Sequence, residues 1–229
     1  MSFDRDAVAR DVPLAPRTTL ELGGRAGYFY EATSEATLLG ALAWAQSEGL
    51  GVTMLAGGSN VVVADDGVAG LVIAPRIRRL TSEVSGRTLR LFVGAGEPWD
   101  DVVAHAVACG ASGIECLSGI PGWAGATPIQ NVGAYGQEVA DVLTHVHVID
   151  RRTRATRVLR AADCAFAYRD SRFKRERDTF IVTGIVLELP LSAPARPRYA
   201  ELDRALPEDA DLATIRSTVI ALRDRKSVV

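Results

Sequence analysis

Two glycine-rich segments hold the residue types best suited to binding an anion. The first, Ala56-Gly-Gly-Ser-Asn60, follows a short apolar run. Glycine adopts positive φ and lets the backbone approach a ligand closely, so successive amide N–H groups can turn toward one anion. Ser59 and Asn60 add side-chain donors. Taken alone, the segment is more typical of an ordinary strand–turn–strand corner, because Gly-Gly turns are common.

The second segment, residues 117–136, is long, rich in glycine and proline, and without clear periodicity. Long irregular loops are uncommon in compact domains and are usually functional where they occur. Gln130 and Asn131 offer amide donors and acceptors among apolar neighbours. A structural Ω-loop is the alternative, but the length and glycine density favour a ligand-binding role.

A third segment, residues 166–174, interleaves aromatic residues with three cations. The cations are Arg169, Arg172 and Lys174. A guanidinium presents a fixed fork of donors, which suits an anionic or carbonyl-bearing substrate. An exposed turn with a salt bridge explains the pattern equally well, and spacing alone does not choose between them.

Signatures of other chemistries are incomplete. Gly94-Ala-Gly96 begins like a dinucleotide fingerprint, but Trp99 stands where its last glycine is needed, and the sequence has no Gly-Lys-Ser/Thr loop. The histidines share no metal-site pattern with carboxylates or thiols; they are His105, His145 and His147. The cysteines match no zinc spacing, and we interpret all three as small buried hydrophobic residues: Cys109, Cys116 and Cys164. We therefore predict no metal site.

Composition indicates a folded chain with no affinity for polyanions. Of its 229 residues, 48% are hydrophobic and 24% charged, unlike a disordered chain. Twenty-six basic and 28 acidic residues give a net charge of -2, so no global basic field attracts nucleic acid or an anionic membrane. The first ten residues lack an apolar core, and no apolar run approaches the ~20 residues that span a bilayer. We expect a cytoplasmic protein with reduced thiols.

Local patterns predict helices and strands around these segments. Helices are predicted over residues 34–49, 99–109 and 211–226. Strands are predicted over residues 52–55, 61–63, 71–73, 89–93, 146–150, 156–159 and 180–189. The Pro-rich residues 191–207 are interpreted as a linker. No element follows the last helix to cover its apolar stripe, so we expect that stripe to be partly exposed and the chain to be poorly soluble.

Four motifs together resemble the UDP-N-acetylenolpyruvoylglucosamine reductase (MurB) family. They are Thr18-Thr19-Leu20 with Gly23-Gly24, Ala56-Gly-Gly-Ser-Asn60, Gly119-Ile-Pro-Gly122 through Ile129-Gln-Asn-Val-Gly-Ala-Tyr-Gly136, and Tyr168-Arg-Asp-Ser-Arg-Phe-Lys174. The resemblance extends from about Leu14 to Lys226. Trp123 is bulkier than the residue that the family commonly has there.

The resemblance implies an α+β, FAD-binding fold of the vanillyl-alcohol-oxidase or p-cresol methylhydroxylase (PCMH) type. It implies a first, small α/β FAD-binding subdomain over residues 1–75 and a second, mixed subdomain over residues 76–190. Residues 191–229 would be a linker and the start of a truncated domain for the UDP-sugar.

The resemblance also assigns site residues. FAD would lie on two glycine loops, with contacts from Ala56, Gly57, Gly58, Ser59, Asn60, Gly119, Ile120, Pro121, Gly122, Gly125, Ala126, Ile129, Gln130, Asn131, Gly133, Ala134 and Gly136. Arg169 would be the catalytic cation that stabilises charge on the substrate carboxylate. Substrate would be bound by Tyr168, Tyr199, Arg223 and Lys226.

The implied activity is the NADPH-linked reduction of UDP-N-acetyl-3-O-(1-carboxyvinyl)-glucosamine to UDP-N-acetylmuramate, a step of peptidoglycan precursor synthesis. The family places its proton donor, a serine or cysteine, after the helix that carries Lys226, and an assisting glutamate later still; neither is among these 229 residues. A positioned acid contributes about 10²–10⁴-fold, so we expect an impaired second half-reaction. A catalytically inactive flavin-binding module is the alternative, and the Tyr168–Lys174 motif disfavours a different flavin oxidase. Oligomeric state is not predicted.

Overall fold

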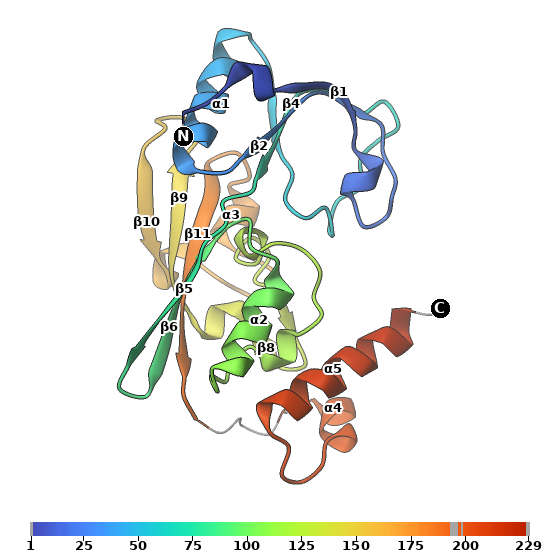
Figure 1. Ribbon diagram of the computed structural model, residues 1–229, viewed down its shortest axis with the longest axis vertical. Helices are drawn as coiled ribbons and strands as arrows, with labels where there is room; N and C mark the ends of the chain where they lie inside the picture. Colours follow the sequence, from blue (N-terminus) through green and yellow to red (C-terminus); the bar gives the residue numbers. More distant parts are fainter. Residues whose placement is uncertain (1, 193–196, 198, 228–229) are drawn as a thin grey trace.

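The first of two sheets is mainly parallel. The computed structural model describes residues 2–192, 197 and 199–227 (Figure 1). The sheet has the order β1-β2-β4-β3, with β2, β4 and β3 parallel and β1 antiparallel at the edge. Its strands are β1 (Ala9–Pro13), β2 (Arg25–Ala32), β3 (Val52–Met54) and β4 (Val68–Pro75).

The second sheet is antiparallel throughout, in the order β10-β9-β11-β6-β5. Its strands are β5 (Leu80–Ser85), β6 (Thr88–Gly94), β9 (Leu143–Asp150), β10 (Thr156–Arg160) and β11 (Phe180–Pro190). β11 is central and buried along most of its length. Helix α2 (Trp99–Ala108) packs its apolar side against this sheet, and Trp99 is wholly buried.

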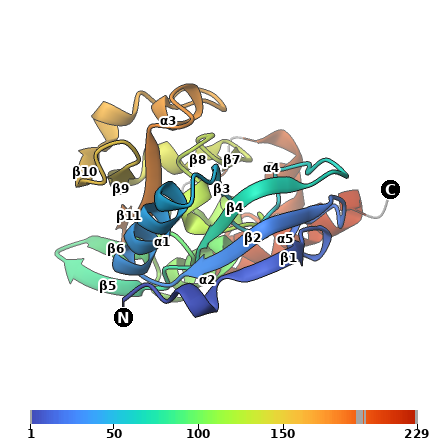
Figure 2. The ribbon, with the colours of Figure 1, turned by 90° about the horizontal axis from the view of Figure 1, so that it is seen from above.

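Helix α1 (Glu35–Ser47) joins the two sheets. Ser34 caps its first turn by accepting a hydrogen bond from the Thr37 amide, and Gly49 follows its end at φ +66°. Its apolar side packs on β2 and β4, and the same core contains Ile149 of β9 and Ile181 of β11. In Figure 2, α1 accordingly lies between the strands of the two sheets.

Shorter elements complete the chain. They are the two-stranded β7 (Gly133–Ala134) and β8 (Gln137–Glu138), the helices α3 (Arg172–Arg175), α4 (Ala200–Ala205) and α5 (Leu212–Ser227), and 3₁₀ turns at Arg5–Ala7, Ala15–Arg17, Glu115–Leu117, Ala124–Ala126, Val139–Asp141 and Ala161–Cys164. In the part of the chain that the structure describes, no helix combines the length and apolar character required to cross a membrane.

Two sequence-based expectations about local elements are wrong. Residues 61–63 form no strand: they follow the first glycine loop and pair with nothing in the sheet, and Val62 is 77% exposed. The predicted linker, residues 191–207, contains helix α4, which packs against α5 (Figure 1). Its residues 193–196 and 198 lie outside the described part of the chain.

The expected exposure of the last helix is also wrong. The apolar stripe of α5 is buried, and its members are Leu212, Ile215, Val219 and Leu222. It packs on Cys116 of the second glycine-rich segment and on Leu202 and Leu206 of the α4 region. The covering partners precede the helix in the sequence, so the reason given for poor solubility does not hold.

The cysteines differ in exposure, which corrects the interpretation that all three are buried. Cys109 is exposed just beyond α2, whereas Cys116 and Cys164 are buried. Burial raises the pKa of Cys116 to about 12 and the pKa of Cys164 to about 11. A thiol is nucleophilic only as the thiolate, so the two buried thiols are unreactive near neutral pH.

We predict that iodoacetamide at pH 8 modifies Cys109 alone in the folded protein. Mass spectrometry of the alkylated chain checks this, with Cys109→Ser as the variant that loses the label and guanidinium-unfolded protein as the control in which all three thiols react. Labelling of Cys116 under native conditions would contradict the packing described above.

Candidate functional site

The two predicted glycine loops touch each other. A Cβ atom built on Gly57 would lie 2.8 Å from Cα of Gly122, and one built on Gly122 would lie 2.8 Å from Oγ of Ser59. Oγ of Ser59 donates a hydrogen bond to the carbonyl of Pro121 at 3.2 Å. Only residues without a side chain allow this approach. The fold therefore brings together two glycine-containing segments that are 62 residues apart in the sequence.

A third contact holds residues 129–131 beside the first loop. Nδ2 of Asn60 donates to Oε1 of Gln130 at 2.9 Å. Behind them, the buried Ser171 donates to the carbonyl of Ile129 at 2.5 Å. Asn131 is buried and donates to Glu138 and to the carbonyl of Ala167. The side chain of Asn131 thus positions the loop through protein contacts.

The remaining predicted cofactor residues differ in their surroundings. Gly125 packs against Ala95, whose Cβ would lie 2.5 Å from an added Cβ, and Gly133 packs against the backbone of Gln137. Gly136, at φ +86°, turns the chain between β7 and β8 with open space beside it. The others lie in the two loops, in the 3₁₀ turn Ala124–Ala126 or in β7: Ala56, Gly58, Gly119, Ile120, Ala126 and Ala134. Gly125 and Gly133 are therefore needed for close packing whether or not they contact a ligand.

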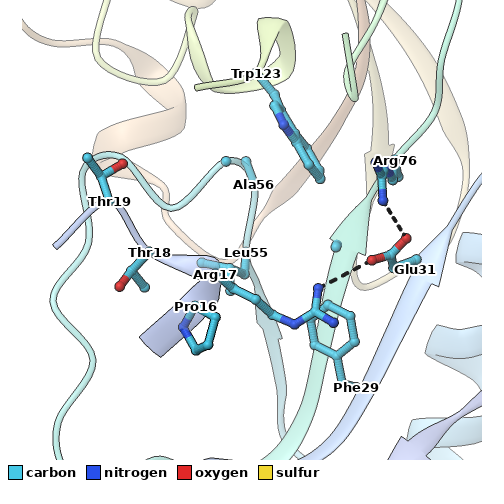
Figure 3. Close-up of a pocket in the computed structure, with 12 residues that line it drawn as sticks. Pro16, Arg17, Thr18, Thr19, Phe29, Glu31, Leu55, Ala56, Arg76 and Trp123 are labelled. Carbon is cyan, nitrogen blue, oxygen red and sulfur yellow. Dashed lines mark hydrogen bonds and ion pairs between the residues drawn. The ribbon is translucent and has the colours of Figure 1, made fainter. Parts of the chain in front are cut away.

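A pocket of about 320 Å³ adjoins the contact between the loops (Figure 3), within the usual size of small-molecule sites. Trp123 of the second loop extends its indole toward it. Its walls are Pro16, Arg17, Thr18, Thr19, Phe29, Glu31, Leu55, Ala56, Gly57, Ala74, Arg76 and Trp123. Both glycine loops and the first sheet contribute, so a ligand here contacts both subdomains predicted from the sequence.

The charged residues that line this pocket form ion pairs with one another. Glu31 accepts hydrogen bonds from Arg17 at 3.3 Å and from Arg76 at 2.9 Å. The Arg17 guanidinium lies over the Phe29 ring, 3.9 Å from its centroid. Sequence analysis missed these residues and Trp123. The only available signal was the position of Arg17 next to the Thr18-Thr19 motif and of Trp123 next to Gly122.

A second group of predicted residues gathers at the end of α5. The Arg223 guanidinium lies 5.5 Å from the centroid of the Tyr135 ring, and Tyr199 packs edge-on against the same ring at 5.2 Å. Burial lowers the pKa of Arg223, and the charge of Arg169 lowers it further. The charge of one cation of the predicted substrate site therefore acts on Arg223, and an anion bound beside Arg223 would favour its charged form.

The Tyr168–Lys174 motif forms an exposed corner beside residues 129–131. Tyr168 is 81% exposed, and the Arg169 guanidinium lies 5.9 Å from its ring centroid. Arg169 has φ +54°, and its carbonyl accepts a hydrogen bond from Nζ of Lys174 at 2.8 Å. Lys226 lies in α5, and its side chain is outside the described part of the structure.

Comparison with known proteins identifies the cofactor. A sequence family described as "FAD binding domain" matches residues 26–158. The chain belongs to this FAD-binding domain family. The matched residues include both glycine loops, which meet beside the pocket. FAD is the cofactor, as the sequence predicted.

Relatives of this FAD-binding chain confirm the resemblance seen in the motifs. UDP-N-acetylenolpyruvoylglucosamine reductase of Thermobifida fusca is 48% identical over 227 residues, which cover 96% of this chain and 64% of the relative. The crystal structure of MurB from Thermus caldophilus superposes with a TM-score of 0.67 at 27% identity, covering 95% of this chain and 69% of that one. The chain spans about three fifths of the length of the curated relatives it matches.

The fold prediction is confirmed as well. A VAO-type flavoprotein from Myceliophthora thermophila superposes on 74% of this FAD-binding chain and 32% of its own, with a TM-score of 0.51 at 17% identity. This likeness concerns the fold alone. Among the described residues, no group of histidine, cysteine, aspartate or glutamate could hold a metal ion.

We predict that Gly57→Ala weakens FAD binding about tenfold or more, because the added methyl group forces apart two backbones in contact and overpacking costs ~1–3 kcal/mol. Titration of the apoprotein with FAD, followed by flavin fluorescence, measures the effect. Gly51→Ala, just before β3, is the matched control, since an added Cβ there meets nothing within 4 Å. Equal affinities of the two variants would show that the loop contact does not shape the cofactor site.

Proposed function

We propose that this chain carries the flavin-binding and part of the substrate-binding machinery of an NADPH-linked reductase. Its substrate would be UDP-N-acetyl-3-O-(1-carboxyvinyl)-glucosamine and its product UDP-N-acetylmuramate, a peptidoglycan precursor. The observation that carries the proposal is the position of Arg223, which lies against Gly119 of the second glycine loop and beside the Tyr135 and Tyr199 rings. The cytoplasm, where UDP-sugars and NADPH are available, is the proposed compartment.

Residues of the two loops fit the cofactor. FAD, when bound, supplies hydride transfer between NADPH and the enolpyruvyl double bond. The backbone amides of residues 56–60, Ile120 and Gly122 would hold its pyrophosphate, since glycines bring the two loops together there. Gln130 and Asn60 are joined by a hydrogen bond and would close the site on one side.

Arg169 would stabilise the negative charge that builds on the substrate carboxylate. Its corner is fixed before substrate arrives: Ser171 ties it to Ile129, and Lys174 donates to the Arg169 carbonyl. A cation held in place costs no reorganisation when charge develops, and such a donor typically contributes about 10²–10³-fold. Arg223 and Tyr199, grouped on Tyr135, would bind the diphosphate and sugar of the substrate, and Lys226 would add charge on the same helix.

For the 229 residues themselves, we propose that the second half-reaction is impaired, because the acid that the resemblance places after Lys226 is not among them. A catalytically inactive flavin-binding module is the second candidate. The pocket and the loop contact are common to both candidates, and the two arginines favour the reductase, since flavin binding alone does not require them.

The visible absorption spectrum of the purified chain, before and after anaerobic addition of NADPH, tests the proposal. We expect a flavin band that NADPH bleaches, followed by slow return of colour when the enolpyruvyl UDP-sugar is added. A flavin band that NADPH leaves unchanged would support the inactive module. A colourless protein that refuses FAD would overturn both candidates.

We predict that Arg169→Met slows reoxidation of the NADPH-reduced protein by the UDP-sugar about 10²-fold, through loss of a preorganised cation. Single-turnover absorbance measures this rate, and the rate of reduction by NADPH should change less than twofold. Arg177→Met, an exposed arginine of the same segment, is the control expected to behave like the natural sequence. An unchanged reoxidation rate in Arg169→Met would remove Arg169 from the mechanism.

A further inference from the structure

Asp100 makes contacts unlike those of an ordinary acidic residue in the first turn of a helix. Its Oδ1 accepts a hydrogen bond from the Gly119 amide at 2.6 Å and another from Nη1 of Arg216 at 2.6 Å. Its Oδ2 accepts from Nη2 of Arg216 at 2.7 Å. The carboxylate therefore joins α2, the second glycine loop and α5 at one point.

The second glycine loop is attached to the first turn of α2 at both of its ends. Asp100 holds the amide of Gly119, and the amide of Trp99 donates to the carbonyl of Gly122 at 2.9 Å. Both glycines have positive φ, +68° and +112°. Between them, the Pro121 carbonyl receives the hydrogen bond from Ser59. The shape of this loop thus depends on two adjacent residues of one helical turn.

Helix α5 reaches the same loop with two arginines. Arg216 grips both oxygens of Asp100, and its side chain is only 19% exposed. Arg223, two turns later, lies so close to Gly119 that an added Cβ there would be 3.1 Å from its Cδ. Bidentate arginine–carboxylate pairs fix geometry as well as charge. Docking of α5 therefore sets the position of Asp100 and, through it, of Gly119.

We propose that Asp100 and Arg216 are positioning residues that couple the docking of α5 to the affinity of the flavin site. Neither touches the cofactor; they act by holding the Gly119 amide and the 119–122 backbone in the conformation that faces the first loop. The inference rests on the proposed placement of FAD on that loop.

The neighbouring Asp101 offers a matched comparison. It lies in the same first turn of α2 and carries the same charge, and its field also acts on Arg216. Asp101 is exposed. Within the part of the chain that the structure describes, the hydrogen bond to the loop comes from Asp100 and not from Asp101. A general effect of acidic charge at the helix start would be the same at both positions.

The test compares the FAD dissociation constants and the bound-flavin absorption and circular dichroism spectra of Asp100→Asn and Asp101→Asn. We expect Asp100→Asn to raise the dissociation constant at least tenfold and to shift the flavin spectrum, and Asp101→Asn to change it less than twofold. Asp100→Glu, which keeps the carboxylate, should recover part of the affinity. Equal affinities and spectra of the two asparagine variants would overturn the proposal.

A second pair of variants distinguishes a positioning role from simple loss of folding. Arg216→Met should weaken FAD binding at least fivefold, Arg216→Lys less, and Asp100→Asn combined with Arg216→Met no more than Asp100→Asn alone, because the two residues act as one unit. The melting temperature of each apoprotein is measured alongside. Arginine variants that melt lower but bind FAD as tightly as the natural sequence would contradict the coupling.

The outcome is distinguishable from failure of the proposed function. These experiments measure FAD affinity and flavin spectra and do not measure turnover. Absence of reductase activity would therefore not change the conclusion about Asp100 and Arg216. If Gly57→Ala weakens FAD binding and Asp100→Asn does not, the flavin site stands and the positioning role is wrong. If neither variant changes the affinity, the placement of FAD on the loops is wrong, and the inference fails with it.

Discussion

Close approach of the Gly57 and Gly122 backbones is the constraint on which the rest of the site depends. It requires residues without side chains on both sides, and it requires the two sheets to dock at a fixed distance. The core shared by α1, β9 and β11 supplies that docking. The hydrogen bonds from Ser59 and Asn60 then fix the loops relative to each other without closing the adjoining pocket. Packing far from the loops thus determines whether the two backbones can approach each other.

Charge in this region is divided between paired and mutually repelling groups. Glu31 is shared by Arg17 and Arg76, and Asp100 is gripped by Arg216, so these groups contribute geometry more than net field. Arg223 instead has a lowered pKa, because it is buried and because the charge of Arg169 acts on it. An incoming anion gains most where like charges already oppose one another. Under the proposed function, recognition of a phosphate or carboxylate would therefore be concentrated at the end of α5.

Helices α1 and α2 could be predicted because their signals are local: a capping serine or a terminal glycine next to a periodic apolar face. The valines at 61–63 failed because β propensity creates a strand only where a partner strand is available. Exposure of the α5 stripe was misjudged because its partners, around Cys116 and Leu202, precede it in the chain. The glycine loops were visible from composition. Asp100, Arg17 and Trp123 were not, since their contacts exist only after distant segments dock.

The position of β11 has a consequence for the order in which the molecule is built. This strand pairs on one side with β6 and on the other with β9, both of which are synthesised earlier. The second sheet therefore stays divided until residues 180–190 have left the ribosome, and such non-local pairing is slow. The first glycine loop emerges long before the scaffold of the second is complete. A nascent chain consequently has the first glycine loop without its partner, and the contact between the two loops belongs to the last stage of folding.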